Sequence, residues 1–556
     1  MTIESADGLF QKKVFTVFFL SLLALFFLIS YKPIFSNDIW LHLKAGEIIT
    51  KNHFQLPDSD PFSYTTEGRS WTLHEWLSQL VFSHVYQFTG FTGLRLLRSF
   101  VEILTLALIS WAAYRQTGHY SITLMILLTT AYLLRTRFFV RPEIFSHLFM
   151  ALFYLIYFTL RKHKPWYLLP ACLGFILWIN VHSFMVMVIF ILLIAVISRG
   201  FFVIQGVEGL FAKPWETRFK AAMLVVGVLS IFLTPYHLDL LNYVFSGSGV
   251  AKGYIIEWQP VFISLQRESY MALRGAVAYP LLLKVVVLGI IIIFAGSLAL
   301  SLFWKGGPRW PLDETLIGLL MSGLALSAIR FVWLLFIPLL LSARYFAMAL
   351  DVVDRRNTMP IVSKIPGLLF LSGGILFWIN SGAKTIPANL HQTIQSDRYP
   401  TAITQILKVT HLDGRMFNPI GWGGYLIFHL YPHYKVFMDG RAVLHGPQLL
   451  QDHYTILHAR RGCEELIDKT YQFDFMLLPK IHGILERCPA PTWMLIFENY
   501  NSSLYLRNNV RNRANLFRIK DYYRAQHVPF DPVKGFDMTR VIQENPGWAS
   551  ELNIED

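Results

Sequence analysis

The chain has 556 residues, of which 54% are hydrophobic and only 15% are charged. Soluble domains carry about 25% charged residues, so this composition excludes an ordinary soluble protein and indicates a polytopic α-helical membrane protein. We interpret the net charge of +13 as an orientation signal and a lipid-contact surface, not as a nucleic-acid-binding surface.

Long apolar runs recur from the N-terminus to about residue 380. The first, 14–31, follows two lysines and lacks a small-x-small cleavage site, so we interpret it as an uncleaved first span. A span needs about 20 apolar residues, and about eleven spans are predicted by that rule. They lie near residues 14–31, 96–114, 120–134, 144–160, 166–181, 184–204, 221–235, 278–304, 315–329, 331–350 and 366–380. Four of the runs are short, which leaves the count open by one or two.

Basic residues mark alternate connections between these runs, and loops rich in Lys and Arg stay in the cytoplasm. We therefore expect a plasma membrane protein of the bacterial inner-membrane type, with a cytoplasmic N-terminus and everything after about residue 381 outside. The residues that carry this signal are Lys12, Lys13, Arg161, Lys162, Lys164, Arg199, Lys213, Arg218, Lys220, Lys305, Arg309, Arg355, Arg356 and Lys364.

The first outer loop, residues 32–95, is long and contains two helical patterns. One covers 38–51, and the other begins in 71–85, where apolar residues form a stripe of helical period. A loop rich in Pro, Ser and Gly separates them. We expect both helices to lie along the membrane surface.

A short outer loop, residues 135–145, breaks the charge rule because it contains Arg135, Arg137 and Arg141. Two explanations remain open. The arginines reach the lipid headgroups, or they bind an anionic ligand, since the guanidinium fork matches phosphate.

Residues 382–556 are predicted to form a separate extracytoplasmic α/β domain, distinct from a transmembrane domain at 1–381. Strands are expected at 434–440 and 473–480, and a hairpin at 493–507 with its turn at Asn499–Asn501. Helical patterns lie near 399–410 and 444–468, before a polar end segment.

The three cysteines show no zinc-site spacing. Cys172 lies in an apolar run and is interpreted as a packing residue. Cys463 and Cys488 share the C-terminal domain, where they either form a disulfide, if the domain is extracytoplasmic, or remain two separate thiols.

Polar residues that could take part in catalysis or binding gather on the predicted outer side. They are Asp38, His42, Asp58, Asp60, His74, Glu75, Arg137, Arg141, Glu143, His182 and Arg330. Each has an ordinary structural interpretation, such as a helix N-cap for Asp38, turn formation for Asp58 and Asp60, and a local hydrogen bond for His182. As a set, they offer a base for an acceptor hydroxyl and cations for a phosphate leaving group. A divalent cation, Mg²⁺ or Mn²⁺, is left open as a cofactor, with Asp38 and Glu143 as its ligands.

The stretch "NDIWLHLKAGEIITKNHFQLPDSDPFSYT…WTLHEWL" resembles the first outer loop of GT-C superfamily membrane glycosyltransferases, which include protein mannosyltransferases and aminoarabinose transferases. Asp38 matches the first acidic residue of that loop, the catalytic one in those enzymes. The resemblance implies a second acid directly after it, but Ile39 stands there, and His42 or Glu75 is a candidate substitute. Glu143 falls in a loop where those enzymes place another functional group.

The stretch "FNPIGWGGYLIFHLYPHYKVFMDGRA" is similar to the W-W-D-Y-G region of oligosaccharyltransferase catalytic subunits. Trp422, Tyr425 and Asp439 stand in similar places. The acid of that motif is replaced by Gly423 or Gly424, and because that acid reads the acceptor sequon, an asparagine-linked acceptor is not expected.

The sequence thus predicts an inverting membrane glycosyltransferase that moves a sugar from a polyprenyl-phosphate-linked donor to an extracytoplasmic acceptor. The catalytic candidates are Asp38, Glu143, His42 and Glu75. The substrate-binding candidates are Arg137, Arg141, Arg330, His74, His182, Trp422, Tyr425, Asp439 and Arg441. A transporter or flippase for a lipid-linked saccharide is one alternative, although corresponding Gly- or Pro-broken spans are not found. A non-catalytic assembly partner with the same fold is the other.

Overall fold

The computed structural model describes residues 6–159, 165–204, 214–251, 255–262, 280–303, 310–354, 365–480, 484–488 and 493–554. The chain forms two compact units. We call the first, Met1–Ile34 with Phe88–Val244 and Ile255–Thr393, the helical unit, and the second, Phe35–Gln87 with Phe245–Tyr254 and Ile394–Asp556, the α/β unit. This grouping differs from the expected division after residue 381, because the first outer loop groups with the C-terminal residues. The last helix of the helical unit also continues to His391.

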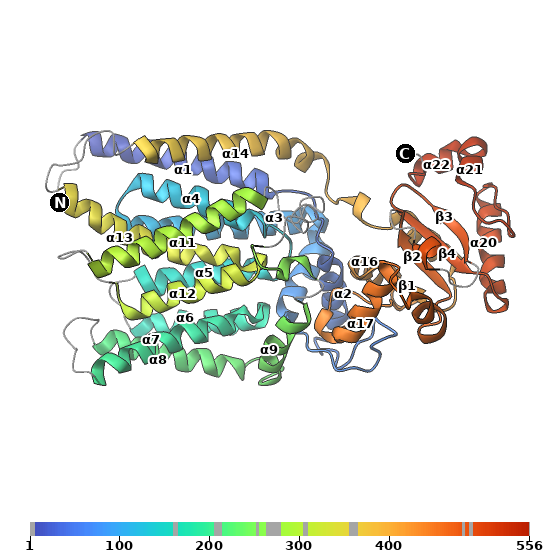
Figure 1. Cartoon of the computed structure of the whole chain (residues 1–556), viewed down its shortest axis with the longest axis horizontal. Coiled ribbons are helices and arrows are strands. Elements are labelled where there is room, and N and C mark those ends of the chain that lie inside the picture. The colour runs from blue at the N-terminus through green and yellow to red at the C-terminus, as the bar shows by residue number, and fades with distance from the viewer. Residues whose placement is uncertain are drawn as a thin grey trace. The chain divides into compact units, whose positions relative to one another are not determined.

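The helical unit is built from helices that run side by side (Figure 1). They are α1 (Ala6–Ser30), the second part of α3 (Trp76–Thr117), α4 (Tyr120–Arg135), α5 (Glu143–Tyr154) with a π turn at Leu155–Thr159, α6 (Leu168–Val181), α7 (Val186–Ile204), α8 (Pro214–Ile231), the first part of α9 (Asp239–Ala251), α11 (Pro280–Phe303), α12 (Leu312–Ser327), α13 (Phe336–Asp354) and α14 (Ile365–His391). Short 3₁₀ turns lie at Pro165–Tyr167, Ser183–Met185, Ile256–Trp258 (η4) and Ile329–Leu335 (η5).

A helix lies in each of the eleven ranges where a span was predicted, and α9 is an additional helix. Among the described residues, four helices are long and apolar enough to cross a membrane: Phe10–Ser30, Trp76–Thr117, Leu281–Phe303 and Ile329–Met348. Shorter apolar helices accompany them. The chain is therefore a multi-pass membrane protein, and the number of crossings stays a prediction. The four basic connections at 160–164, 205–213, 304–309 and 355–364 lie outside the described residues, so the orientation also stays a prediction.

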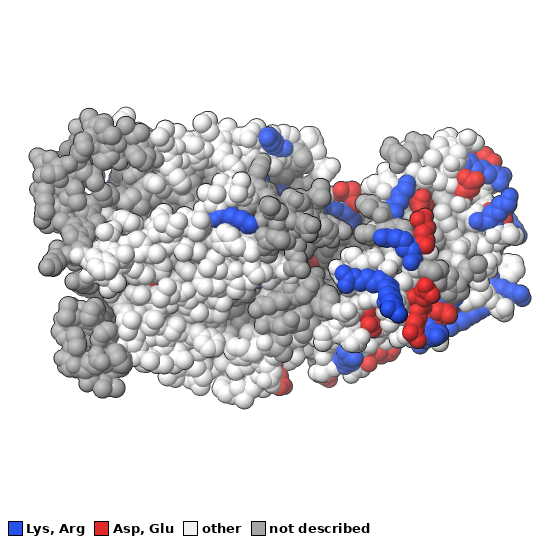
Figure 2. Space-filling view, in the orientation of Figure 1, with Lys and Arg blue, Asp and Glu red and all other residues white. Residues whose placement is uncertain are grey.

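The surface of the two units differs in charge. On the face in view, charged side chains gather over the α/β unit, whereas the described surface of the helices is almost uncharged (Figure 2). Large apolar side chains such as Leu281 and Phe303 are more than two thirds exposed on α11. An uncharged surface with exposed apolar side chains suits lipid contact.

Two buried arginines of α3 bind the end of α1. The Arg95 guanidinium donates to the carbonyl oxygen of Tyr31 at 2.9 Å, and that of Arg98 donates to the carbonyl oxygens of Ser30 and Lys32. The last carbonyls of a helix have no intrahelical partner, and an unsatisfied polar group is costly where water is absent. These two cations therefore complete the hydrogen bonding at the C-terminus of α1.

The α/β unit contains α2 (Asp38–Lys51), the first turns of α3, and the elements after residue 394. These are α15 (Thr401–Thr410), β1 (Met416–Phe417), α16 (Ile420–Leu430), α17 (Ala442–Leu457), α18 (Cys463–Glu465), β2 (Phe475–Pro479), α19 (Ile484–Arg487), β3 (Trp493–Glu498), β4 (Ser502–Arg507), α20 (Arg513–Ala525), α21 (Met538–Glu544) and α22 (Pro546–Glu551). The sheet has the order β1-β2-β4-β3, with β1 parallel to β2 and the other pairs antiparallel.

The hairpin of β3 and β4 and the strand β2 confirm two of the three strand predictions. The third, at 434–440, is wrong, because this segment does not join the sheet. The amide of Val436 donates to the carbonyl oxygen of Phe62 and its carbonyl accepts from the amide of Tyr64, so its partner is the first outer loop. The predicted helix at 444–468 is interrupted at Gly446, which has a φ of 77°, and ends at Leu457 before the short α18.

The second predicted surface helix is continuous with the second apolar run in α3. The two parts meet at Gly90, whose φ of 63° and ψ of −157° are not helical. A positive φ costs glycine little because it has no Cβ atom. The first predicted surface helix is α2, with the expected bounds.

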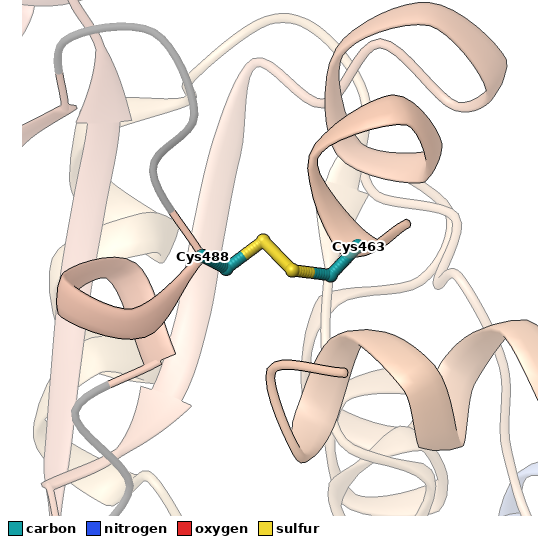
Figure 3. Close-up of a disulfide and its surroundings, with 2 residues drawn as sticks. All are labelled: Cys463 and Cys488. Carbon is teal, nitrogen blue, oxygen red and sulfur yellow. A yellow bond between two sulfur atoms is a disulfide. The ribbon is translucent and has the colours of Figure 1, made fainter. Parts of the chain in front are cut away.

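Cys463 and Cys488 form a disulfide within the α/β unit (Figure 3). It joins α18 to the residue that follows α19, and 25 positions separate the two cysteines along the chain. The paired alternative left open by the sequence is therefore the one that the structure contains. Cys172 is a free thiol.

Candidate active site

Asp38 is the first residue of α2, where a carboxylate interacts favourably with the positive end of the helix dipole. Its side chain is half-buried and faces the turn at Gly440. A Cβ atom built at Gly440 would lie 2.7 Å from Oδ1 of Asp38, closer than real Cβ contacts. The two stretches that resemble glycosyltransferase motifs thus meet in the α/β unit.

Two further glycines explain why the second motif lacks its acid. A Cβ atom at Gly423 would lie 2.2 Å from the carbonyl oxygen of Met438, and one at Gly424 would lie 2.8 Å from that of Asn37. Helix α16 therefore packs against α2 and against the segment before Asp439 at distances that leave no room for a side chain. This close packing excludes an aspartate at either position.

Asp439 is fully buried and is held by charged and polar partners. Nε and Nη2 of Arg441 donate to its two carboxylate oxygens at 2.8 and 2.5 Å, and Oγ of Ser63 donates at 3.2 Å. Burial by itself raises the pKa of a carboxyl group, but the Arg441 guanidinium lowers the pKa of Asp439 well below its usual range. Asp439 is therefore ionised, and it holds the side chains of Arg441 and Ser63 in place.

The same arginine connects Asp439 to the first outer loop. Nη1 of Arg441 lies 2.8 Å from Oδ1 of Asp60, and the guanidinium stacks over the Trp71 ring at 4.6 Å. Asp60 is 2% exposed and also accepts from the hydroxyl of Thr66 and the amide of Phe62. Asp60 is thus part of a buried ion-pair cluster, which goes beyond the turn formation expected for it.

The other acid of the first loop lies between two imidazoles. Oε2 of Glu75 is 4.0 Å from Nε2 of His42, and Oε1 is 3.5 Å from Nε2 of His74. Gln79 is 3.3 Å from the other ring nitrogen of His42. The structure therefore brings His42, His74 and Glu75 together.

Aromatic residues of the second motif form the packing around Trp40. Its indole, 1% exposed, makes edge contacts with Tyr399 and Tyr425 at 5.3 and 4.9 Å. Nε1 of Trp422 donates to the carbonyl oxygen of Arg398. Trp422 and Tyr425, both predicted to bind substrate, are buried and pack inside the unit.

In the helical unit, Arg137 and Glu143 lie in a buried charge network. Nε of Arg137 donates to Oε2 of Glu143 at 3.1 Å, and its Nη1 donates to Oε2 of Glu257 at 2.6 Å. Nη1 of Arg141 donates to both oxygens of Glu257 at 3.0 and 2.9 Å. Carboxylates thus compensate two of the three arginines in the segment 135–145, Arg137 and Arg141.

The network continues from Glu143 into the helices. Nε2 of His147 lies 3.9 Å from Oε1 of Glu143, and its Nδ1 is 2.9 Å from Oε1 of Glu102 on α3. All three side chains are buried. Such a network of paired buried charges fixes the arrangement of α3, α5 and η4.

Arg330 and His182 differ in their surroundings. The Arg330 guanidinium stacks over the Trp258 ring at 4.4 Å and has no carboxylate within ion-pair distance among the described residues. Nδ1 of His182 is 2.7 Å from Oγ of Ser146, which also accepts from the indole of Trp178. His182 is therefore a buried, hydrogen-bonded histidine, and Arg330 is a cation that attracts Glu143 and Glu257 over a longer distance than an ion pair.

For a divalent cation, the described residues offer no group of three or more His, Cys, Asp or Glu side chains in a metal-ligating arrangement. Asp38 and Glu143, the ligands considered from the sequence, belong to different units. The dependence of the protein on a metal stays a prediction.

Sequence reasoning did not find Glu257, Glu102, His147 or His445 as members of the two clusters. Glu257 pairs with residues 116 and 120 positions away, a distance over which no local pattern acts. A signal existed for His147, because it stands four positions after Glu143 on the same helix face.

No protein-family model matches the chain, and a search of curated proteins finds no match. Two solved structures resemble it. The oligosaccharyltransferase of Archaeoglobus fulgidus, in the apo form, shares 12% identity at a TM-score of 0.51, over 88% of this chain and 74% of that one. ArnT from Cupriavidus metallidurans, bound to undecaprenyl phosphate, shares 12% identity at a TM-score of 0.47, over 88% and 97%.

The likeness to the archaeal oligosaccharyltransferase defines the fold class. The chain has the fold of a GT-C membrane glycosyltransferase, with apolar helices followed by a domain that contains a sheet. This confirms the fold resemblance that the two sequence motifs indicated.

Proposed function

We propose that this protein is a membrane glycosyltransferase that moves a sugar from a polyprenyl-phosphate-linked donor to an extracytoplasmic acceptor. The observation that carries the proposal is the contact between Asp38 and the turn at Gly440. It places a half-buried carboxylate at a helix N-terminus, next to the ionised Asp439–Arg441 pair, in a chain with the fold of an oligosaccharyltransferase. A shared fold does not define a reaction, so the site residues carry the argument.

Asp38 acts as the general base. Its carboxylate accepts the proton of the acceptor hydroxyl while the hydroxyl oxygen attacks the anomeric carbon of the donor sugar. The new carbon–oxygen bond forms as the bond from that carbon to the phosphate oxygen breaks. Polyprenyl phosphate leaves as an anion, and the single displacement inverts the anomeric configuration.

Arg330 stabilises the leaving phosphate. Developing negative charge is best stabilised by a fixed cation in a site with little water. Arg330 is assigned this role because its guanidinium is held over the Trp258 ring and pairs with no described carboxylate within ion-pair distance, while Arg141 shares Glu257 with Arg137. In this assignment Arg141 is the second phosphate contact, while Arg137 and Glu143 stabilise the charge network of the helical unit.

Ile39 stands where the resembled enzymes have a second acid, and Glu75 is a better substitute for that acid than Glu143. Glu75 is 15% exposed and lies between the imidazoles of His42 and His74, whereas Ile39 offers no carboxylate. Oε2 of Glu143, by contrast, accepts from two nitrogens of Arg137. Glu75 therefore supports the reaction electrostatically beside Asp38.

The proposed orientation places the α/β unit outside the membrane. The disulfide between Cys463 and Cys488 supports this side, because disulfides persist in oxidising compartments such as the bacterial periplasm. The packing at Gly423 and Gly424 supports an acceptor other than an asparagine sequon, since the sequon-reading acid has no room there.

The test uses the purified protein in liposomes with a radiolabelled polyprenyl-phosphate sugar and cell-envelope acceptors. Sugar transfer that is lost in Asp38→Asn supports the proposal. Movement of the labelled lipid across the bilayer without transfer supports a flippase, and neither activity, in any acceptor preparation, supports a non-catalytic assembly partner. Repeating the transfer assay with a chelator tests the metal.

A further inference from the structure

A pocket of about 380 Å³ opens in the α/β unit, between the first outer loop and the start of the second part of α17. It is lined by Tyr64, Thr65, Arg69, Arg415, His445, Gly446, Pro447, Gln448, Leu449 and Tyr471. This lining contains two arginines and no Asp or Glu. The volume lies within the range of about 300–1,000 Å³ typical of small-molecule sites.

The positive charges of the two arginines are not paired with a described carboxylate and can therefore interact with a ligand. Nη1 of Arg69 lies 3.4 Å from the carbonyl oxygens of Leu444 and His445, and Nη1 of Arg415 donates to the carbonyl oxygen of Tyr471 at 3.2 Å. Both are exposed, and neither has a carboxylate within ion-pair distance among the described residues. Each guanidinium is thus positioned by neutral carbonyls and retains donors that match an anion.

Further donors lie in the wall of the pocket. Gly446 breaks α17, so a new helix of eleven residues begins at Pro447, and its first amides and positive dipole end favour an anion. His445 is 2% exposed, and its Nε2 accepts from the amide of Asp439 at 3.1 Å. Its Nε2 also lies 3.5 Å from Oδ2 of Asp439, and its Nδ1 has no hydrogen-bond partner among the described residues.

The two tyrosines offer ring faces more than hydroxyl groups. The hydroxyl of Tyr64 donates to the carbonyl oxygen of Met416 at 3.0 Å, and that of Tyr471 donates to Oδ2 of Asp452 at 2.6 Å. The Tyr471 ring stacks on Phe473 and Tyr64 packs against Phe437, so the parts of the two rings that line the pocket are what a sugar ring would contact with its carbon–hydrogen face.

We propose that this pocket binds an anionic sugar unit of the acceptor, one that bears a carboxylate or a phosphate group. The inference rests on the proposed function, because it takes the acceptor to be a glycan. His445 connects the pocket to the catalytic turn: it lines the pocket and bonds the backbone of Asp439, the residue before Gly440. An acceptor held here is therefore held by the segment that also positions Asp38.

The experiment measures binding of small probes to the full-length protein in detergent by saturation-transfer NMR and calorimetry. The probes are glucuronate, glucose 6-phosphate, glucose and inorganic phosphate. The variant is Arg69→Gln/Arg415→Gln. The control is Arg524→Gln, an arginine on α20 that is 70% exposed and pairs with Asp521.

We expect glucuronate or glucose 6-phosphate to bind and glucose to bind at least about tenfold more weakly, with a similar loss in the double arginine variant and none in Arg524→Gln. Equal binding of glucose overturns the inference. So does inorganic phosphate that binds as tightly as the sugar phosphate, since the pocket would then recognise an anion alone.

The inference and the proposed function fail in different ways. Asp38→Asn should bind the probes like the wild type, because Asp38 does not line the pocket. Suppose that the wild type transfers sugar, and that the double arginine variant binds the probes and transfers sugar equally well. The inference is then wrong and the proposed function stands. If no sugar is transferred but the probes bind and the arginine variant loses them, the pocket stands as a glycan site.

Discussion

The carboxylate of Asp38 occupies the space in which a side chain at position 440 would stand, with Oδ1 only 2.7 Å from the position of a Cβ atom at Gly440. One residue comes directly after the first apolar helix, and the other lies about 400 positions later in the chain, next to a buried ion pair. Their contact makes two kinds of variant informative, one that changes the carboxylate and one that displaces it.

Asp38→Asn should lower the rate of sugar transfer by about 10²- to 10⁴-fold, because the amide keeps the shape of the side chain but cannot accept a proton. The measurement is transfer in liposomes at matched protein amounts. Asp58→Asn, in the same loop, is the control. If Asp38 were only a surface carboxylate, the variant would transfer at the wild-type rate.

Gly440→Ala should lower transfer by about 10²-fold, because the added methyl group displaces the Asp38 carboxylate and a misplacement of about 1 Å has that cost. Gly547→Ala is a matched control, since no described atom lies within 4 Å of the Cβ atom there. Both variants should fold, as judged by thermal melting in detergent. Wild-type activity of Gly440→Ala would show that the position of Asp38 is unimportant.

Arg137→Met should destabilise the helical unit by about 3–5 kcal/mol, because it leaves Glu143 and Glu257 as buried carboxylates without their shared partner. The melting temperature and the expression level are the measurements. Arg137→Lys should recover only part of the loss, because an ammonium group cannot contact both carboxylates in a fork. An unchanged melting temperature would contradict the structural role of the network.

Arg330→Lys should lower transfer by about 10- to 100-fold without changing the melting temperature. Lys keeps the positive charge that attracts Glu143 and Glu257, so stability is unaffected, while the guanidinium fork to the phosphate is lost. Arg141→Lys should behave similarly but more mildly. Full activity of both variants would favour a role of these arginines at the lipid headgroups.

Acid should destabilise the α/β unit through His429, which packs against Tyr425 and Trp40. Burial, with Lys408 and Lys44, lowers the pKa of His429 to about 4. The unfolded chain binds this proton near pH 6.5, so the stability from the neutral ring is present above that pH and is lost as the pH falls toward 4. Melting temperatures of His429→Leu should fall less over this window than those of the wild type, whereas the exposed His458→Leu should follow the wild type.

Apolar runs predicted the helices of this protein well, because the bilayer demands them and a long run has few other uses. The hairpin at 493–507 was equally predictable, from alternating residues and a clear turn. The segment 434–440 is rich in residues typical of strands, but Val436 pairs with the first outer loop and not with the sheet. No local sequence pattern identifies a partner so far away in the chain.

The site was predictable only in part. Asp38 was found because it directly follows the first apolar run, and its contact with Gly440 depends on a fold that the residues alone do not provide. In the sequence, Gly423 and Gly424 indicated only that the acid of the motif is absent. The structure adds that close helix packing leaves no room for a side chain at either position. The disulfide stayed open because spacing gives no distance in space.

The hydrogen bonds from Arg95 and Arg98 to the end of α1 can form only after both arginines have been synthesised, which is later than α1 itself. The carbonyls that they satisfy precede them by 64 to 68 positions in the chain. At a synthesis rate of roughly 5–20 residues per second, the first helix waits about 3–14 s for these partners to leave the ribosome. During that interval the C-terminal end of α1 depends on water or on the insertion machinery for hydrogen bonds, so the first helix is made before it can be fully docked.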